Sequence, residues 1–194
     1  MLLAIDIGNT NISIGVFKED SLIAKKSLKT NLKASQVEVR DEILDFLKND
    51  FPNYINLNRA IIGSVVPSIT NLVKSSVEQI IDLNVCVMNP KTKTNIDILY
   101  DTPSEVGSDR ICDAVAAKIL YPKNKIIVDF GTATVFDAVT EQGEYLGGAI
   151  SPGIHISSES LYLHTSLLKR IEVSPTKKVI GTNTNDSLQS GLFW

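Results

Sequence analysis

Three aspartates are placed where an acidic side chain could do chemistry. Asp6 and Asp129 each end an apolar run, and a glycine follows each of them two residues later. A charge at the end of a buried strand is costly unless it is paired or bound to a cation, so both positions indicate a site. Asp109 stands beside Arg110. Asp109 suits a general base that accepts a hydroxyl proton as a phosphoryl group moves, and Arg110 suits carboxylates and phosphates.

The loop after Asp6 has the composition of a phosphate-binding turn. Gly8 lets the backbone approach a ligand closely, and Asn9, Thr10 and Asn11 supply donors for phosphate oxygens. The loop is not a Walker loop, because no Lys-Ser/Thr pair follows a Gly-x4-Gly spacing. A single Asp-x-Gly motif is equally well explained by an ordinary hairpin turn, so the interpretation depends on a second copy.

The second copy is the segment 125–134, which repeats the order of residue types found in the segment 2–11. Each copy is followed by two more strand-like segments separated by turns. Two repeats are too few for a solenoid, but they suit two similar domains that face each other across a cleft. Carboxylates that face phosphates would act through a bound cation or a water on it, and Thr10 and Thr132 would donate to phosphate oxygens.

The elements that position these loops are predicted from capping and hydrophobic spacing. Ser35 and Glu38 form a capping box at the start of a helix that Pro52 ends. After the first three strands, the expected elements are a helix over 35–51, a strand over 59–66, a helix over 67–81 and a strand over 84–88. The order βββαβαβ predicts parallel crossovers, and we expect a first domain over residues 1–103.

The second domain is expected over residues 104–194. Its predicted elements are a helix over about 104–120, three strands over 125–150, a helix over about 151–170 and a final helix over 183–194. Gly107 falls inside the first of these helices, where glycine is costly. The last helix has no cap and no polar tail, so we expect the chain to be shorter than its fold requires.

The composition excludes several classes of protein. The 194 residues are 43% hydrophobic and 21% charged, with a net charge of −3, which predicts a globular protein without an electrostatic reason to bind nucleic acid. Cys86 and Cys112 have no metal-like spacing and do not suggest a disulfide framework, so a reducing cytosol fits best. No apolar run has the length of a signal peptide or a membrane span.

Several candidate residues have two explanations. Asp109 is either the base or a helix N-terminal acid that the macrodipole favours, with Arg110 as a surface partner. Tyr100 either lines the same pocket or packs on the linker. Thr184 is either a helix N-cap or a ligand contact. The glycines in Gly147–Gly148 and Pro152–Gly153 either form simple turns or let the backbone pass close to a ligand.

Taken in order, the motifs resemble those of type III pantothenate kinases. The resemblance rests on Asp6–Thr10, Tyr100 with Pro103–Arg110, Asp129–Ala133 and Gly147–Gly153, and it covers essentially the whole chain. It implies an α/β fold of two similar ribonuclease H-like domains, as in the acetate kinase, sugar kinase, Hsp70 and actin superfamily, with the second domain incomplete. It also implies ATP-dependent phosphorylation of pantothenate, the first step of coenzyme A synthesis.

The resemblance implies a role for each matching residue. The ATP-binding set is Asp6, Ile7, Gly8, Asn9, Thr10, Asn11, Ile12, Ser13 and Thr132. The pantothenate-binding set is Tyr100, Gly107, Ser108, Asp109, Arg110 and Thr184. Asp109 matches the proton acceptor, and Asp129 matches the ligand of a monovalent cation, potassium or ammonium. Family members are cytoplasmic homodimers that use a divalent ion, Mg²⁺, with ATP.

One departure keeps alternatives open. The family runs on for tens of residues beyond the segment that matches Gln189–Gly191, with a Gly-Gly loop near the adenosine and the last elements of the second domain. The alternatives to an active kinase are a non-catalytic accessory relative of the same fold, a truncated inactive kinase, and another small-molecule kinase or phosphatase of the superfamily. The intact set of Asp6, Asp109 and Asp129 favours the enzyme.

Overall fold

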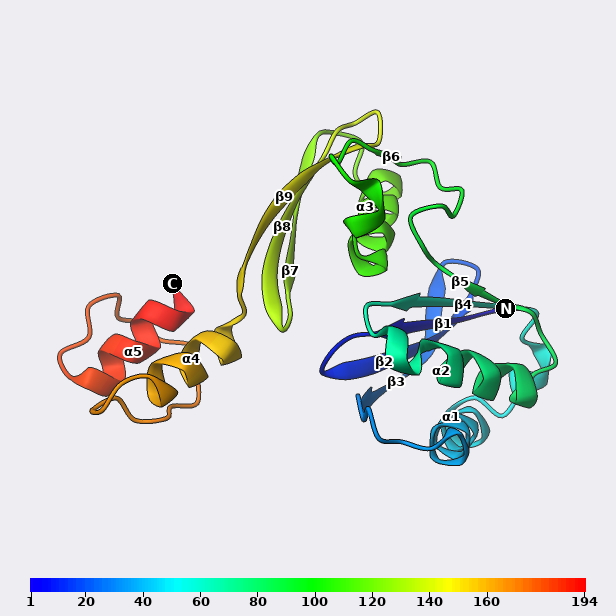
Figure 1. The fold of residues 1–194 in the computed structure, drawn as a ribbon, viewed down its shortest axis with the longest axis horizontal. Helices are drawn as coiled ribbons and strands as arrows, with labels where there is room; N and C mark the ends of the chain where they lie inside the picture. The colour runs from blue at the N-terminus through cyan, green and yellow to red at the C-terminus, as the bar shows by residue number, and fades with distance from the viewer. The chain divides into compact units, whose positions relative to one another are not determined.

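The computed structural model describes residues 1–194, which form two compact units, Met1–Ala116 and Ala117–Trp194. Both units combine a sheet with helices, so the predicted α/β class is confirmed (Figure 1). The boundary between the two units lies inside the helix that spans Ser108–Leu120. The predicted domain division between residues 103 and 104 stays a prediction. None of the helices has the length and apolar character needed to cross a membrane.

The first unit is built on a five-stranded sheet. Its elements are β1 (Leu2–Ile7), β2 (Asn11–Lys18), β3 (Ser21–Lys29), α1 (Gln36–Asp50), η1 (Tyr54–Asn56), β4 (Arg59–Ser64), α2 (Pro67–Ile80), β5 (Val85–Val87), β6 (Asp97–Ile98), η2 (Pro103–Glu105) and most of α3 (Ser108–Leu120). The sheet has the strand order β3-β2-β1-β4-β5. β2 is antiparallel to both of its neighbours, β1 and β3, and β4 is parallel to both of its neighbours, β1 and β5. The predicted βββαβαβ order and its parallel crossovers are confirmed.

Alternating burial gives this sheet two different faces. Ile5 and Ile7 are buried in the core, where α1 and α2 pack against the same face of the sheet (Figure 1). Asp6 lies between them in sequence and is exposed, because successive side chains on a strand point to opposite faces. Asp6 therefore belongs to the face that α1 and α2 do not cover.

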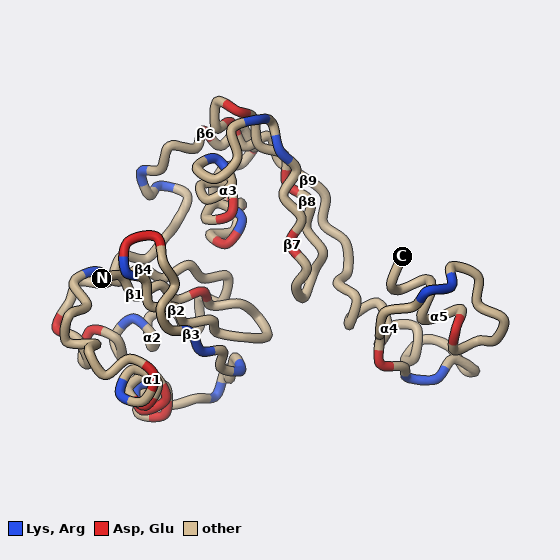
Figure 2. Tube along the Cα trace, turned by 180° about the vertical axis from the view of Figure 1, so that it is seen from behind, with Lys and Arg blue, Asp and Glu red and all other residues tan.

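The predicted capping box starts α1. The Glu38 N–H donates to the Ser35 hydroxyl (3.3 Å), and the Glu38 carboxylate accepts from the Ser35 N–H (2.7 Å). The Glu38 carboxylate also accepts from the Ser35 hydroxyl (2.8 Å), and the two bonds that it accepts from the Ser35 N–H and hydroxyl lower its pKa. The helix carries both acidic and basic residues (Figure 2), and Arg40 and Asp41 form an ion pair of 2.8 Å. α1 is thus a surface helix with one apolar stripe.

The helix predicted from about residue 104 begins later. The structure has a separate short helix, η2, and starts α3 at Ser108, so Gly107 precedes the helix instead of interrupting it. Glycine inside a helix costs about 1 kcal/mol relative to alanine, which favours a turn at this position. A Cβ on Gly107 would also collide with a carboxylate oxygen of Asp109. The glycine therefore leaves room for the Asp109 side chain.

The second unit contains β7 (Lys125–Phe130), β8 (Ala133–Val139), β9 (Glu144–Pro152), α4 (Ile154–Leu163), α5 (Thr184–Phe193) and the end of α3. The three strands are antiparallel neighbours in sequence order, as predicted. The helix predicted to reach about residue 170 is wrong beyond Leu163. The Thr165 hydroxyl donates to the Leu161 carbonyl (2.7 Å) and accepts from the Leu168 N–H (3.3 Å), so a turn replaces the last helical bonds.

Candidate active site

The loop between β1 and β2 is closed by backbone hydrogen bonds. The Gly8 N–H donates to the Asn11 carbonyl (2.9 Å). Thr30 holds the loop twice, because its N–H donates to the Thr10 carbonyl (2.9 Å) and its hydroxyl donates to the Gly8 carbonyl (2.7 Å). A Cβ on Gly8 would stand 3.2 Å from the Asn11 carbonyl oxygen, so a larger residue would crowd the turn. The loop is a defined turn with Asn9, Thr10 and Asn11 exposed.

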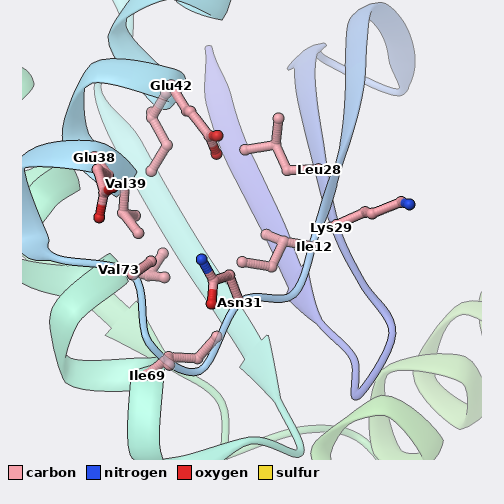
Figure 3. A pocket seen from close by; sticks show the side chains of 11 residues that line it. Ile12, Leu28, Lys29, Asn31, Glu38, Val39, Glu42, Ile69 and Val73 are labelled. Carbon is pink, nitrogen blue, oxygen red and sulfur yellow. The ribbon is translucent and has the colours of Figure 1, made fainter.

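The loop residues divide between the two faces of the sheet. Asp6 and Ser13 pair across β1 and β2, and both are exposed. Ile7 and Ile12 also pair, but their side chains are only 0% and 5% exposed. Ile12 lines a cavity of about 110 Å³ between the sheet and the helices α1 and α2 (Figure 3). Ile7 and Ile12 can therefore offer only backbone atoms to a ligand at the Asp6 face.

The start of α3 is bonded to the end of β4. The Ser108 Oγ accepts from the Ser64 N–H (2.7 Å) and donates to the Ser64 carbonyl (2.8 Å). A Cβ on Gly63 would lie 3.7 Å from the Cys112 Sγ and 3.9 Å from the Ser108 Oγ, so the helix stands directly over this glycine. Gly63 pairs with Asp6 in the parallel β1–β4 ladder. The first turn of α3 is thus attached one strand away from Asp6, on the same face.

The Cys112 thiol lies close to two of the three predicted acids. Burial, together with the charges of Asp113, Asp6 and Asp109, raises the pKa of the Cys112 thiol to about 11. Coulomb interactions weaken with distance and with solvent screening, so the carboxylates that act on this thiol lie near it. Because α3 stands over Gly63, which pairs with Asp6, the start of α3 that carries Asp109 lies at the same open face of the first sheet as Asp6. The thiol stays protonated at neutral pH and adds no third negative charge.

Tyr100, Asp109 and Arg110 lie together at the start of α3. The Asp109 Oδ1 accepts from the Arg110 N–H (2.8 Å). The Arg110 guanidinium carbon lies 5.9 Å from the centre of the Tyr100 ring, at the outer limit of a cation–π contact. All three residues are half-buried. The first unit thus gathers the predicted base, a cation and an aromatic hydroxyl around one helix end.

The second unit holds its own version of the loop. The Gly131 N–H donates to the Ala133 carbonyl (2.9 Å), which repeats the closure of the first loop. Asp129 and Thr132 are exposed beside this turn. The Gly153 N–H donates to the Thr132 carbonyl (3.0 Å), and a Cβ on Gly153 would collide with the carbonyl oxygens of Gly131 and Thr132. Gly153 therefore serves close packing against the loop.

In the second unit, the structure corrects the N-cap prediction for Thr184 and places His155 near the second loop. Asn183, and not Thr184, is the N-cap of α5, because the Asn183 side chain accepts from the Asp186 N–H (2.9 Å). Thr184 is the first exposed residue of that helix. A cavity of about 270 Å³ also borders the second loop, and its lining includes Phe130, Gly131, Thr134, Ile154, His155 and Phe193. Sequence reasoning gave His155 no role.

Sequence reasoning also missed the residues that hold the site in place. Thr30 and Ser64 bond to the backbone or side chain of residues 22 and 44 positions away, and no local pattern marks such contacts. A buried pair in the second sheet was missed for the same reason: the Tyr145 hydroxyl donates to the Asp137 Oδ1 (2.9 Å). These side chains support the strands and loops from which the exposed site residues project.

The acids of the site are single carboxylates. No group of three or more His, Cys, Asp or Glu side chains is arranged to hold a metal ion. Mg²⁺ commonly binds through one or two carboxylates, waters and substrate phosphates, without an all-protein cage. Asp6 in the first unit and Asp129 in the second unit each offer carboxylate oxygens, which are donors of the kind that cations bind.

Comparisons with known proteins give a consistent result. A family model described as "Type III pantothenate kinase" matches residues 2–194. Two relatives with that name match the whole chain: one from Halalkalibacterium halodurans is 39% identical over 194 residues, and one from Finegoldia magna is 43% identical over 194 residues. The chain covers 76% and 74% of these two relatives, respectively.

A solved structure supports the fold. The type II variant of the Aquifex aeolicus Ppx/GppA phosphatase is similar with a TM-score of 0.52 and 16% sequence identity. The match covers 82% of this chain and 55% of the phosphatase, so the chain spans about half of that protein. At this identity the likeness concerns the fold alone, and it confirms the predicted actin-like ATPase fold class.

Proposed function

The chain belongs to the type III pantothenate kinase family, and we propose that Asp109 is the general base of its reaction. The reaction of the family is the ATP-dependent phosphorylation of pantothenate in coenzyme A biosynthesis, with ATP accompanied by a divalent cation. The observation that carries the role of Asp109 is its position at the start of α3, which stands over the Gly63 partner of Asp6, next to Arg110 in the chain.

The proposed step moves one proton and one phosphoryl group. The Asp109 carboxylate accepts the proton of the pantothenate hydroxyl while the hydroxyl oxygen forms a bond to the γ-phosphorus of ATP. The bond between that phosphorus and the β–γ bridging oxygen breaks, and ADP leaves. Arg110 pairs with the pantothenate carboxylate, and Tyr100 and Gly107 line the same site. Thr184 is proposed as a further contact to the substrate.

The loop after β1 is proposed to bind the phosphates of ATP. Asn9, Thr10 and Asn11 are exposed donors on a turn that Thr30 holds in place. Ser13 lies on the same face as Asp6, and Thr132 is proposed to add a donor from the second loop. A Mg²⁺ ion bound with ATP supplies positive charge to the phosphates, and Asp6 would hold it directly or through water.

Asp129 is proposed to hold a monovalent cation, K⁺ or NH₄⁺. It occupies the position of the repeat that corresponds to Asp6, and its carboxylate is exposed beside the closed turn of the second loop. Replacing potassium with sodium should then depress turnover. The Asp129→Asn variant should respond less to this exchange than the wild-type chain does. Equal wild-type rates in both salts would remove the proposed role.

A homodimer in the cytoplasm is also proposed. The support is the resemblance of the ordered motifs to a family whose members have that state, with Thr184 as a contact to the substrate. Sedimentation velocity at micromolar concentration should give a species of twice the monomer mass. A monomer under conditions of full turnover would contradict the dimer.

The test of the proposed function is steady-state turnover of the folded chain. ADP release is measured with pantothenate, ATP, Mg²⁺ and K⁺, and parallel reactions omit pantothenate or replace it with a sugar. Release that depends on pantothenate, with phosphopantothenate as the product, is the expected result. Folded protein that binds pantothenate without turnover would indicate a non-catalytic relative. Turnover only with the sugar would indicate another kinase of this fold.

A further inference from the structure

Ser108 differs from the other residues of its predicted set because its hydroxyl is already engaged. The side chain accepts one hydrogen bond from the peptide N–H of Ser64 and donates one to the carbonyl of the same residue. Ser108 is only 5% exposed. A serine hydroxyl has a single proton to donate, and here that proton goes to the protein backbone. The hydroxyl is therefore a poor candidate for a pantothenate contact.

Ser64, to which the Ser108 hydroxyl is bonded, is itself held in place by hydrogen bonds. The Ser64 hydroxyl is bonded to the Thr70 hydroxyl (2.7 Å) and accepts from the Val66 N–H (3.1 Å). The next peptide group, the Val65 N–H, donates to the Ile7 carbonyl of β1 (3.0 Å). The end of β4 is thus bonded to α2 on one side and to β1 on the other.

The two bonds between Ser108 and Ser64 consequently connect the base to the phosphate loop. Ser108 precedes Asp109, and Ser64 lies beside Ile7, which follows Asp6. A change in the seating of α3 on β4 would move the Asp109 carboxylate relative to Asp6. Misplacement of a reacting group by about 1 Å can cost about a hundredfold in rate.

We propose that Ser108 is a positioning residue, whose hydroxyl fixes the start of α3 on β4 and thereby sets the position of Asp109 relative to Asp6. This inference rests on the proposed function of Asp109. It replaces the pantothenate contact that the sequence predicted for the Ser108 side chain. The geometry assigns the fixing role to the hydroxyl, which serine and threonine share and alanine lacks.

The test compares three variants with the wild-type chain. Ser108→Ala removes both bonds, and Ser108→Thr keeps a hydroxyl. Ser76→Ala is the matched control, because Ser76 is 0% exposed and its hydroxyl donates to the Leu72 carbonyl (2.9 Å) on α2. We expect Ser108→Ala to lower kcat about a hundredfold, with the KM for pantothenate within about twofold of wild type. Ser108→Thr should recover part of kcat, and Ser76→Ala should keep it.

A second readout does not depend on activity. Cys112 lies one helical turn after Ser108, and both face Gly63. Loss of the two bonds should let the helix start open more often, so alkylation of Cys112 should be about tenfold faster in Ser108→Ala than in Ser76→Ala. Thermal unfolding of every variant establishes that the folded proteins are compared.

The outcomes separate the two proposals. An active wild-type chain with Ser108→Ala at a normal kcat would overturn the positioning role. A raised KM for pantothenate at an unchanged kcat would also overturn it, because that result indicates a direct substrate contact. An inactive wild-type chain would instead contradict the proposed function. The alkylation rates would then decide alone whether Ser108 holds the start of α3.

Discussion

The two sheets of this chain have the same pattern of strands and turns, but they differ in how far helices cover them. In the first unit the apolar neighbours of Asp6 are buried under α1 and α2, with Ile5 3% and Ile7 0% exposed. In the second unit the apolar neighbours of Asp129 stay exposed, with Val128 at 41% and Phe130 at 71%. The same alternation of residue types therefore produces a core only where helices return to the sheet.

The Asp-x-Gly loops of the two units are closed in the same way, although the apolar neighbours of the acid are buried only in the first unit. Each turn is closed by a glycine N–H bonded to a carbonyl two or three residues later, at 2.9 Å in both cases. Thr30 fixes the first loop, and Gly153 packs against the second. The Asp-x-Gly turn is thus a local structure that forms with either kind of sheet. Local turn chemistry and global packing are separable properties of this fold.

The largest expected effect tests whether the apolar neighbours of the acid are buried only in the first of the two sheets. Ile7→Ala should lower the free energy of unfolding by about 2–5 kcal/mol, because it leaves a cavity in a closed core. Phe130→Ala, at the corresponding place after Asp129, should change it by less than about 0.5 kcal/mol, because its ring is exposed. Urea denaturation measures both values. A loss in Phe130→Ala as large as that in Ile7→Ala would show that the second face is covered in solution.

The burial of Cys112, together with the acids around it, gives the next effect. The raised pKa of Cys112, about 11 against an ordinary 9.0, should leave about a hundredfold less thiolate at pH 8 than a thiol with the ordinary value. Cys86 is exposed and serves as the internal control. Iodoacetamide should label Cys112 far more slowly, with a rate that still rises above pH 9. Equal rates for the two cysteines would contradict the burial of the Cys112 thiol among these acids.

The smallest effect concerns the helices that follow the strands. α1 begins with a side-chain cap, whereas the N-cap of α4 is Gly153, which has none. Ser35→Ala should cost about 1 kcal/mol at neutral pH. The pKa of Glu38 is lowered, so its contribution is present above the ordinary value of 4.5 and is lost as the pH falls through the lowered value. The cost of Ser35→Ala should therefore shrink in acid, as urea midpoints at pH 7 and pH 3 would show. If the cost of Ser35→Ala does not depend on pH, the hydrogen bond from the Ser35 hydroxyl to the Glu38 carboxylate does not contribute to it.

Many of the predicted features that the structure confirms are local ones. The strand triplets and the capping box of Ser35 depend on residues close in sequence, and the structure has both. The start of α3 was predicted too early, because Pro103–Glu105 form the separate short helix η2 and Gly107 stands before α3. The extension of α4 was predicted too long because apolar residues continue after Leu163, where the Thr165 hydroxyl takes over the bonding.

The support of the candidate site was beyond sequence reasoning. The bonds between Ser108 and Ser64 join residues 44 positions apart, and only the packing of α3 on β4 brings them together. The exposed acids, in contrast, were visible as charges at the ends of apolar strands. The sequence therefore predicted which side chains face a ligand, while the structure revealed which side chains hold them in place. The roles of Asp6, Asp109 and Asp129 stay predictions.

The most direct test of the account is the turnover of Asp109→Asn. Loss of the proton acceptor should lower kcat for pantothenate phosphorylation by about 10²–10⁴-fold. Pantothenate affinity, measured by calorimetry, should stay close to that of the wild-type chain, because Arg110 and Tyr100 are unchanged. Asp101→Asn is the matched control, since it is an exposed acid of the preceding segment outside the predicted site. A folded Asp109→Asn protein that phosphorylates pantothenate at a near-normal rate would contradict Asp109 as the base.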